Sequence, residues 1–70
     1  MAVEKGYYKH YKGNVYEVIG EATHTETEEK LIIYRPVVGN LSDVWARPAS
    51  MWNDIIDGKK RFERIKYNVR

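Results

Sequence analysis

The stretch from Val15 to Ala22 constrains the fold of this chain more than any other segment. Tyrosine, valine, glycine and alanine alternate there with Glu17, Ile19 and Glu21. Successive side chains of a strand point to opposite faces of a sheet, so this two-residue period is typical of a β-strand with one buried face. The sequence therefore predicts a sheet that packs one face on a core.

Further short strands are predicted along most of the chain. Leu31 to Val38 is rich in β-branched and aromatic residues, and Pro36, which cannot donate to a ladder, predicts an edge, a bulge or a strand end. The polar residues from Thr23 to Lys30 indicate the loop of a long antiparallel hairpin. The other predicted elements are strands Tyr7 to Lys12, Val44 to Arg47 and Arg61 to Tyr67, with one helical turn from Pro48 to about Trp52.

The length of the chain allows one small core. Seventy residues without cysteine must be held together by aromatic and aliphatic packing, because no disulfide can form. We expect residues 1–70 to form a single, mostly β domain, either a small bent antiparallel sheet or an SH3-like barrel, with one short helical turn. Among the aromatic residues we expect Tyr16 and Trp45 in the core, and Tyr8, Tyr11 and Trp52 at the surface.

Charge is distributed unevenly along the chain. The net charge is +2, but Lys and Arg counted against Asp and Glu give about −4 for residues 17–30 and about +5 for residues 58–70. Glu4 and Lys5 stand where a secretory signal needs an apolar run, and no later stretch approaches the length of a membrane span. We therefore expect a cytoplasmic protein with no membrane contact.

Several short motifs together resemble one known family. They are Tyr8-Lys9-His10-Tyr11-Lys12-Gly13, Ala22-Thr23-His24 with Glu26-Thr27, Tyr34-Arg35, Trp45-Ala46-Arg47-Pro48 and Arg61-Phe62. In this combination, over nearly the whole chain, they resemble the bacterial domain of unknown function 1653 (DUF1653) family. The resemblance implies a compact, mostly β, barrel-like domain with no assigned activity.

Two histidines and one glutamate are the candidates for metal binding or acid–base chemistry. A neutral imidazole can ligate zinc or transfer a proton near neutral pH, and a carboxylate could orient it. His10, His24 and Glu26 lack a metal-ligand spacing such as His-x-x-x-His, so we predict no metal, no cofactor and no catalytic residue. In the structural interpretation, His24 bonds the backbone of its turn and His10 packs beside tyrosine.

Arginines beside aromatic residues form the strongest candidate binding site. If neighbouring strands pair, alternation could bring two or three guanidinium groups to one face, suited to phosphate or carboxylate: Arg35, Arg47 and Arg61. The alternative is internal ion pairing with Glu17, Glu26 or Asp43. The predicted ligand-binding surface comprises His24, Glu26, Tyr34, Arg35, Trp45 and Arg47.

The function expected from this surface is non-catalytic binding of an anionic ligand: a nucleotide, a phosphate or a nucleic acid. Arginine would contact the anion, an aromatic ring would supply a stacking wall, and His24 would tune the site. Two alternatives stay open. A protein-interaction adaptor would use an exposed strand edge ending near Pro36, as a monomer or a homodimer, and a small hydrolase would use His24 with Glu26.

Overall fold

A five-stranded antiparallel sheet dominates the computed structural model, which describes residues 3–39 and 42–66. Its strand order is β4-β3-β2-β1-β7. The strands are β1 (Gly6–His10), β2 (Val15–Thr23), β3 (Lys30–Pro36), β4 (Trp45–Pro48) and β7 (Phe62–Ile65). The predicted mostly β, antiparallel class is confirmed, in its bent-sheet form: β4 and β7 remain as edges, so the sheet does not close into a barrel.

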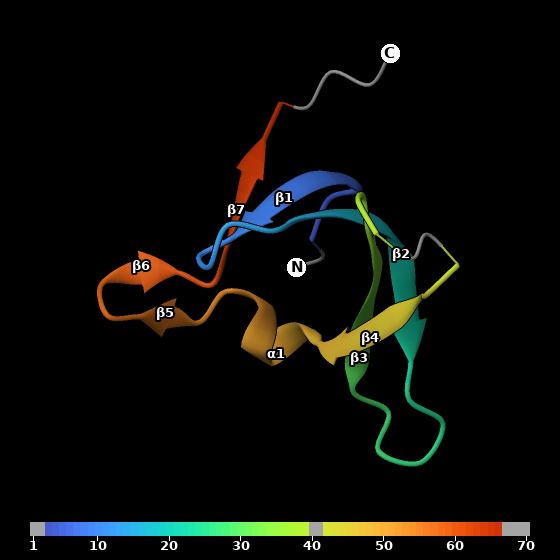
Figure 1. Cartoon of the computed structure of the whole chain (residues 1–70). Helices are drawn as coiled ribbons and strands as arrows, with labels where there is room; N and C mark the ends of the chain where they lie inside the picture. The colour runs from blue at the N-terminus through green and yellow to red at the C-terminus, as the bar shows by residue number, and fades with distance from the viewer. Residues whose placement is uncertain (1–2, 40–41, 67–70) are drawn as a thin grey trace.

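A short connection between β4 and β7 folds beneath the sheet (Figure 1). It begins with helix α1 (Ala49–Trp52), the single turn that the sequence predicts, and continues as the small hairpin β5 (Ile55–Ile56) and β6 (Lys59–Lys60). Asp57 and Gly58 have φ angles of 50° and 79°, and two positive φ values are typical of a tight hairpin turn whose twist matches its strands. The Asp57-Gly58 dipeptide favours a turn, but strands of two residues are too short for periodicity to detect.

The predicted strands differ from the observed ones mainly at their ends. β1 stops at His10 instead of Lys12, because the backbone N–H of Gly13 bonds the His10 carbonyl at 2.7 Å and reverses the chain. β3 ends at Pro36, one of the predicted outcomes. The last strand covers Phe62–Ile65, and the predicted end at Tyr67 lies outside the described residues.

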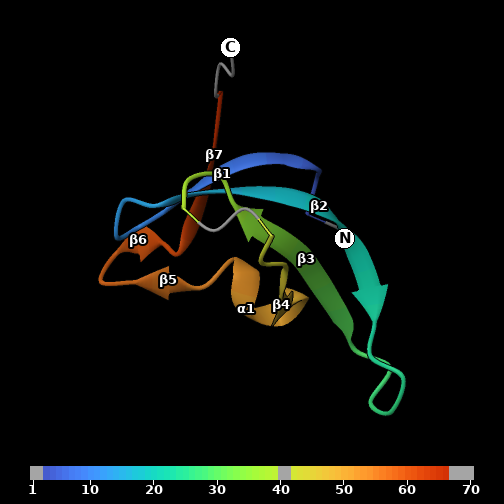
Figure 2. The same cartoon turned by 45° about the vertical axis from the view of Figure 1, so that its right-hand side comes forward.

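The long strand β2 bends the sheet. Its pairing with β3 shifts register between Val18 and Gly20, so one extra residue is inserted in β2. A bulge of this kind bends the strand that carries it and increases its twist. The sheet therefore arches over α1, as Figure 2 shows, and its inner face becomes the concave side of the molecule.

The core lies between this inner face and α1. Its buried residues are Tyr8, Val18, Ile32, Tyr34, Trp52 and Phe62. Trp52 is fully buried and stacks on Phe62, with the ring centroids 3.8 Å apart and the planes 3° from parallel.

Three of the expected aromatic placements are wrong. Trp52 and Tyr8 are buried, whereas Trp45 is 41% exposed. The cause is the course of the chain: α1 folds back under the sheet and carries Trp52 into the core, while Trp45 begins an edge strand with no strand beyond it. Tyr11 is exposed as expected, and Tyr16 is partly buried against the core.

Candidate anion-binding site

The structure places the six predicted site residues in three separate regions. His24 and Glu26 lie in the loop between β2 and β3, which extends away from the sheet in Figure 1. Arg35 lies on the outer face of the sheet, and three residues lie on the inner face: Tyr34, Trp45 and Arg47. The six therefore do not form one surface.

His24 holds the β2–β3 loop in shape. Its ring nitrogen Nδ1 accepts the backbone N–H of Glu26 at 3.1 Å and that of Thr27 at 3.3 Å. The structural interpretation of His24 is thus confirmed. Since backbone donors occupy Nδ1, this nitrogen is not free to accept a proton from a substrate or to bind a metal.

Arg35 is paired internally on the outer face. Glu17 and Arg35 are directly opposite each other in the β2–β3 ladder, and Arg35 donates from Nε at 3.1 Å and from Nη2 at 3.0 Å to Glu17 Oε1. The expected alternative of internal pairing therefore holds for this arginine. An exposed pair of this kind contributes little to stability.

The pairing of β3 with β4 brings together the other three predicted site residues, Tyr34, Trp45 and Arg47. Tyr34 is opposite Trp45, with ring centroids 5.8 Å apart, and Ile32 is opposite Arg47. Because these pairs share one face, Arg47 points to the inner side, where its guanidinium carbon lies 5.6 Å from the centroid of the Phe62 ring. Arg47 is thereby attached to the aromatic core.

The sequence-based site omitted His10, which contacts the same phenylalanine. The His10 and Phe62 rings meet edge to face, with centroids 5.0 Å apart, because these two residues are paired between β1 and β7. His10 Nδ1 accepts the backbone N–H of Lys12 at 3.1 Å, so the proton of the neutral ring is on Nε2, which is a donor. One sequence signal was available: His10 follows Tyr8 by two residues and must share its face.

Positive charge surrounds His10. Partial burial, and then the nearby charges of Arg47, Arg61 and Lys12, lower the pKa of His10 below its usual 6.5. Arg61 also forms an ion pair with Asp54 at 3.4 Å. Arg47 has no ion pair with any carboxylate of the described residues. The ring is therefore neutral at neutral pH and lies in a region of positive potential.

Three buried N–H groups around Phe62 lack an acceptor in the described part of the chain. They are Arg47 Nε, Trp52 Nε1 and Arg61 Nε. All three are donors, and all belong to side chains that contact Phe62 or adjoin it in sequence. Buried donors are almost always paired; Trp52 is fully enclosed, so only the two partly exposed arginines could turn a donor to an acceptor outside the core.

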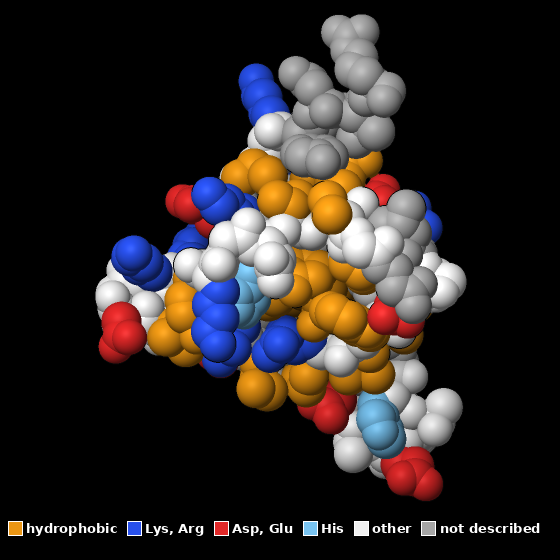
Figure 3. Space-filling model, viewed as in Figure 1, with side chains coloured by type: hydrophobic (Ala, Val, Ile, Leu, Met, Phe, Trp, Pro, Cys, Tyr) orange, Lys and Arg blue, Asp and Glu red, His pale blue; other side chains and the backbone are white. Residues whose placement is uncertain are grey.

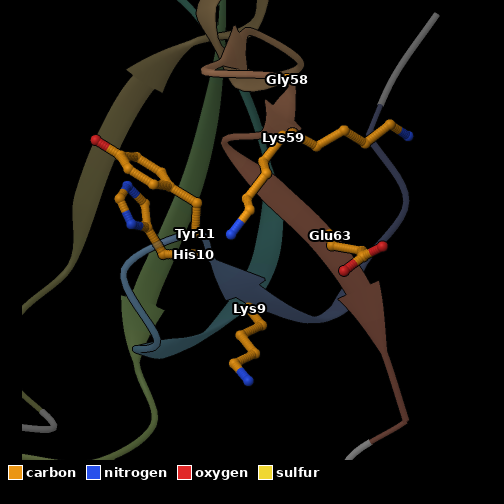
Figure 4. Close-up of a pocket in the computed structure, with 7 residues that line it drawn as sticks. Lys9, His10, Tyr11, Gly58, Lys59 and Glu63 are labelled. Carbon is orange, nitrogen blue, oxygen red and sulfur yellow. The ribbon is translucent and has the colours of Figure 1, made fainter.

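A basic pocket adjoins the same histidine. It has a volume of about 520 Å³ and is lined by Lys9, His10, Tyr11, Gly58, Lys59, Lys60 and Glu63. Figure 3 shows Lys and Arg side chains gathered around a histidine on the side that carries β5, β6 and α1. In Figure 4 the rings of His10 and Tyr11 lie against each other, and Glu63 lies on the opposite side of the pocket.

Residues 3–39 and 42–66 carry neither a metal-binding cluster nor a membrane-spanning helix. No group of three or more His, Cys, Asp or Glu side chains could hold a metal ion there. No helix in those residues has the length and apolar character needed to cross a membrane.

Comparisons with known proteins agree on the family. The family model described as "Protein of unknown function (DUF1653)" matches residues 6–65, from the first residue of β1 to the last of β7. A crystal structure of a DUF1653 protein from Bordetella bronchiseptica is similar, with a TM-score of 0.83 and 26% sequence identity, over 97% of this chain and 94% of that one. No curated protein matches. The resemblance seen in the sequence is thus confirmed, and the chain belongs to the DUF1653 family.

Proposed function

We propose that this protein is a non-catalytic, cytoplasmic binding module for an anionic ligand, with its site on the inner face of the sheet at Arg47, Arg61 and His10. The observation that supports this proposal is the pair of buried arginine donors, Arg47 Nε–H and Arg61 Nε–H, that have no acceptor among the described residues; Trp52, which carries the third such donor, is fully enclosed in the core. Leaving a buried donor unpaired costs about 1–3 kcal/mol. An oxyanion would supply several acceptors at once.

The chemistry of the donors favours an oxyanion over a neutral ligand. Arginine presents its N–H groups in a planar fork that fits phosphate, sulfate or carboxylate. His10 adds a neutral Nε2–H donor, and no carboxylate of the described residues pairs with Arg47. Trp45, which is 41% exposed, lies on the same face, two positions along the β3–β4 ladder from Arg47, and would form the aromatic wall beside the anion.

Sulfate titration followed by two-dimensional NMR tests the proposal. We expect the backbone resonances of His10, Arg47 and Phe62 to shift in a saturable way. Replacing Arg47 by Met keeps the length of the side chain and removes its charge and donors. Since one hydrogen bond to a charged group contributes about 1.5–3 kcal/mol, the affinity for sulfate should fall roughly tenfold or more.

Arg35→Met is the matched control, because Arg35 lies on the outer face, where it pairs with Glu17. It should leave sulfate binding unchanged. Arg61→Lys keeps the charge but removes the Nε donor, and should weaken binding with little effect on folding. Equal loss in the Arg35 and Arg47 variants, or no saturable shift at all, would contradict an inner-face site.

A second candidate function is protein binding through the edge strand β4. Its supporting observation is exposed apolar surface there: Val44 is 57% exposed and Trp45 41% exposed, and Val38 nearby is 77% exposed. An unpaired strand edge beside apolar side chains can accept a strand of another chain. If the partner is a second copy, sedimentation equilibrium should show a concentration-dependent dimer that Val44→Ser with Trp45→Ser abolishes; a monomer at all concentrations would contradict this form.

A further inference from the structure

We infer that the ligand of this protein is a nucleotide, free or within a single strand of nucleic acid, whose phosphate occupies the inner-face site and whose base stacks on Tyr11 beside the basic pocket. This inference rests on the proposed function. The inference adds a second half to the proposed site. This half is formed by the end of β1, the following turn and the β5–β6 hairpin (Figure 4).

His10 connects the two halves. Its ring contacts Phe62 at 5.0 Å on the side of the inner-face donors, and it also lines the basic pocket together with Tyr11. The two halves of the proposed site therefore share the side chain of His10. A bare phosphate is too small to use both, whereas a phosphate joined to a sugar and a base extends from one to the other.

Tyr11 provides the surface for the base. Tyr11 is 38% exposed, and its ring lies against the ring of His10, with centroids 4.5 Å apart and planes 32° from parallel. Lys12 lies 5.9 Å from the centroid of the Tyr11 ring. The Lys12 ammonium lies over the ring face, and a base that replaces this flexible side chain would stack on Tyr11, as bases do on aromatic side chains in proteins that bind single strands without sequence preference.

The charge and size of the pocket fit the same ligand. Three lysines line it, Lys9, Lys59 and Lys60, against one acid, Glu63. Its volume of about 520 Å³ is within the range of small-molecule sites, roughly 300–1,000 Å³. Lysines at a phosphate site act as point charges that attract further phosphates, so the pocket would accommodate the charge that follows the first nucleotide.

Isothermal titration calorimetry at fixed ionic strength tests the inference with four ligands: sulfate, ribose 5-phosphate, uridine 5′-phosphate and a short oligouridylate. Ribose 5-phosphate carries the phosphate and sugar without the base. We expect uridine 5′-phosphate to bind roughly tenfold more tightly than ribose 5-phosphate, since stacking of one base has an effect of this order. Comparing the affinities of the oligouridylate and of uridine 5′-phosphate shows whether the ligand is a single strand or a free nucleotide.

Two sets of substitutions show which residues are responsible for the tighter binding of uridine 5′-phosphate and of the oligouridylate. Tyr11→Ala should remove the advantage of uridine 5′-phosphate over ribose 5-phosphate and leave sulfate binding intact. Lys59→Glu with Lys60→Glu should weaken the oligouridylate by roughly tenfold or more. Lys30→Glu with Lys66→Glu makes the same change of net charge on lysines outside the pocket, and should have a much smaller effect.

Each outcome decides between the two proposals. Sulfate binding that depends on Arg47, with no preference for the base, would overturn the inference and leave the proposed function standing. No binding of any of the four ligands would overturn both. If the oligouridylate binds more tightly than uridine 5′-phosphate and this gain is lost with Lys59 and Lys60, the ligand is a strand; equal affinity per site identifies a free nucleotide.

Discussion

The loops that follow β1 and β2 use the same local structure in opposite surroundings. In both, a histidine at the end of a strand turns its Nδ1 onto the backbone N–H two residues later: His10 onto Lys12 and His24 onto Glu26, each at 3.1 Å. His10 then packs on Phe62 among positive charges. His24 lies in an acidic loop remote from the core, with Glu26, Glu28 and Glu29 close in sequence.

The comparison shows that the local hydrogen bond of a histidine is independent of the contacts that its ring makes with the rest of the molecule. The backbone bond needs a ring nitrogen at the right position, and both loops supply it. A binding role also needs complementary charge and a second surface, which the β1–β7 pairing and the β5–β6 hairpin bring to His10 alone. The residue types in the two loops are therefore a poor guide to which histidine lies among positive charges and beside a second surface.

Removing the ring that supports the His10 region should have the largest effect. Phe62 is buried and touches Trp52, His10 and Arg47. Phe62→Ala should lower the free energy of unfolding by about 3–5 kcal/mol, through lost burial and the cavity left behind. Urea denaturation followed by circular dichroism measures it.

Phe62→Leu keeps most of the side-chain volume and replaces Phe62→Ala in this measurement if the alanine variant does not fold. Trp45→Ala removes a larger side chain that is 41% exposed and should cost clearly less than Phe62→Ala. A larger loss at Trp45 would show that the core is organised around β4 instead of Phe62.

Substitution of each histidine by Ala and by Asn tests the comparison directly. His24→Ala should lower the free energy of unfolding by about 0.5–1 kcal/mol, and His24→Asn should restore it, because an Asn side chain can accept the same backbone N–H. His10→Ala should cost about 2 kcal/mol, since its aromatic contacts are lost as well.

His10→Asn should recover only the part due to the backbone bond. Thermal denaturation of the four variants under one buffer gives the comparison. Full recovery with Asn at His10 would show that its ring contacts with Phe62 and Tyr16 contribute nothing to stability, and the distinction between the two loops would disappear.

The smallest expected effect is a pH dependence that originates at His10. Its pKa is lowered in the folded protein from the usual 6.5, so the unfolded chain binds a proton more readily. The stability due to the neutral ring is present above pH 6.5 and is lost as pH falls from there to the folded-state pKa. Denaturation between about pH 7 and pH 5.5 should show this loss, and His10→Asn should flatten it.

Measuring the pKa of His10 with and without sulfate tests whether the anion binds beside this ring. An anion bound beside His10 offsets the charges of Arg47 and Arg61, so it should raise the pKa of His10, as read from the ring resonances by NMR. Sulfate keeps its two charges throughout this pH range, so its own titration does not interfere. A pKa of His10 that does not respond to saturating sulfate would place the anion elsewhere on the molecule.

Much of the fold could be predicted from local sequence. The strand β2 and the polar loop after it depend on neighbouring residues, and the structure confirms both, although the bulge reverses the predicted alternation beyond Val18. Pro36 ends β3, which is one of the three outcomes that the sequence left open. The single helical turn after Pro48 is confirmed as well. The exposure of the tryptophans could not be predicted, because Trp52 is enclosed only by the fold of α1 beneath the sheet, while Trp45 lies on an edge strand.

The candidate site was predicted only in part. Of the six residues, the inner-face group of Tyr34, Trp45 and Arg47 shares a location, whereas Arg35 points outward and His24 lies in a distant loop. Strand parity could have separated Arg35 from Tyr34, since adjacent residues of a strand face opposite ways. Parity could not reveal that Phe62 meets His10 and Arg47, because those contacts join β7, β1 and β4.

The sequence by itself determined the class of the fold, the family and the local turns, because periodicity, proline, glycine and histidine act on residues close to them in the chain. Only the tertiary structure decided which aromatic residues form the core, that the sheet stays open, and that Arg47 faces inward over Phe62. These features depend on the pairing of strands far apart in the sequence and on the bend that the bulge in β2 gives to the sheet, and neither leaves a periodic signal in the chain.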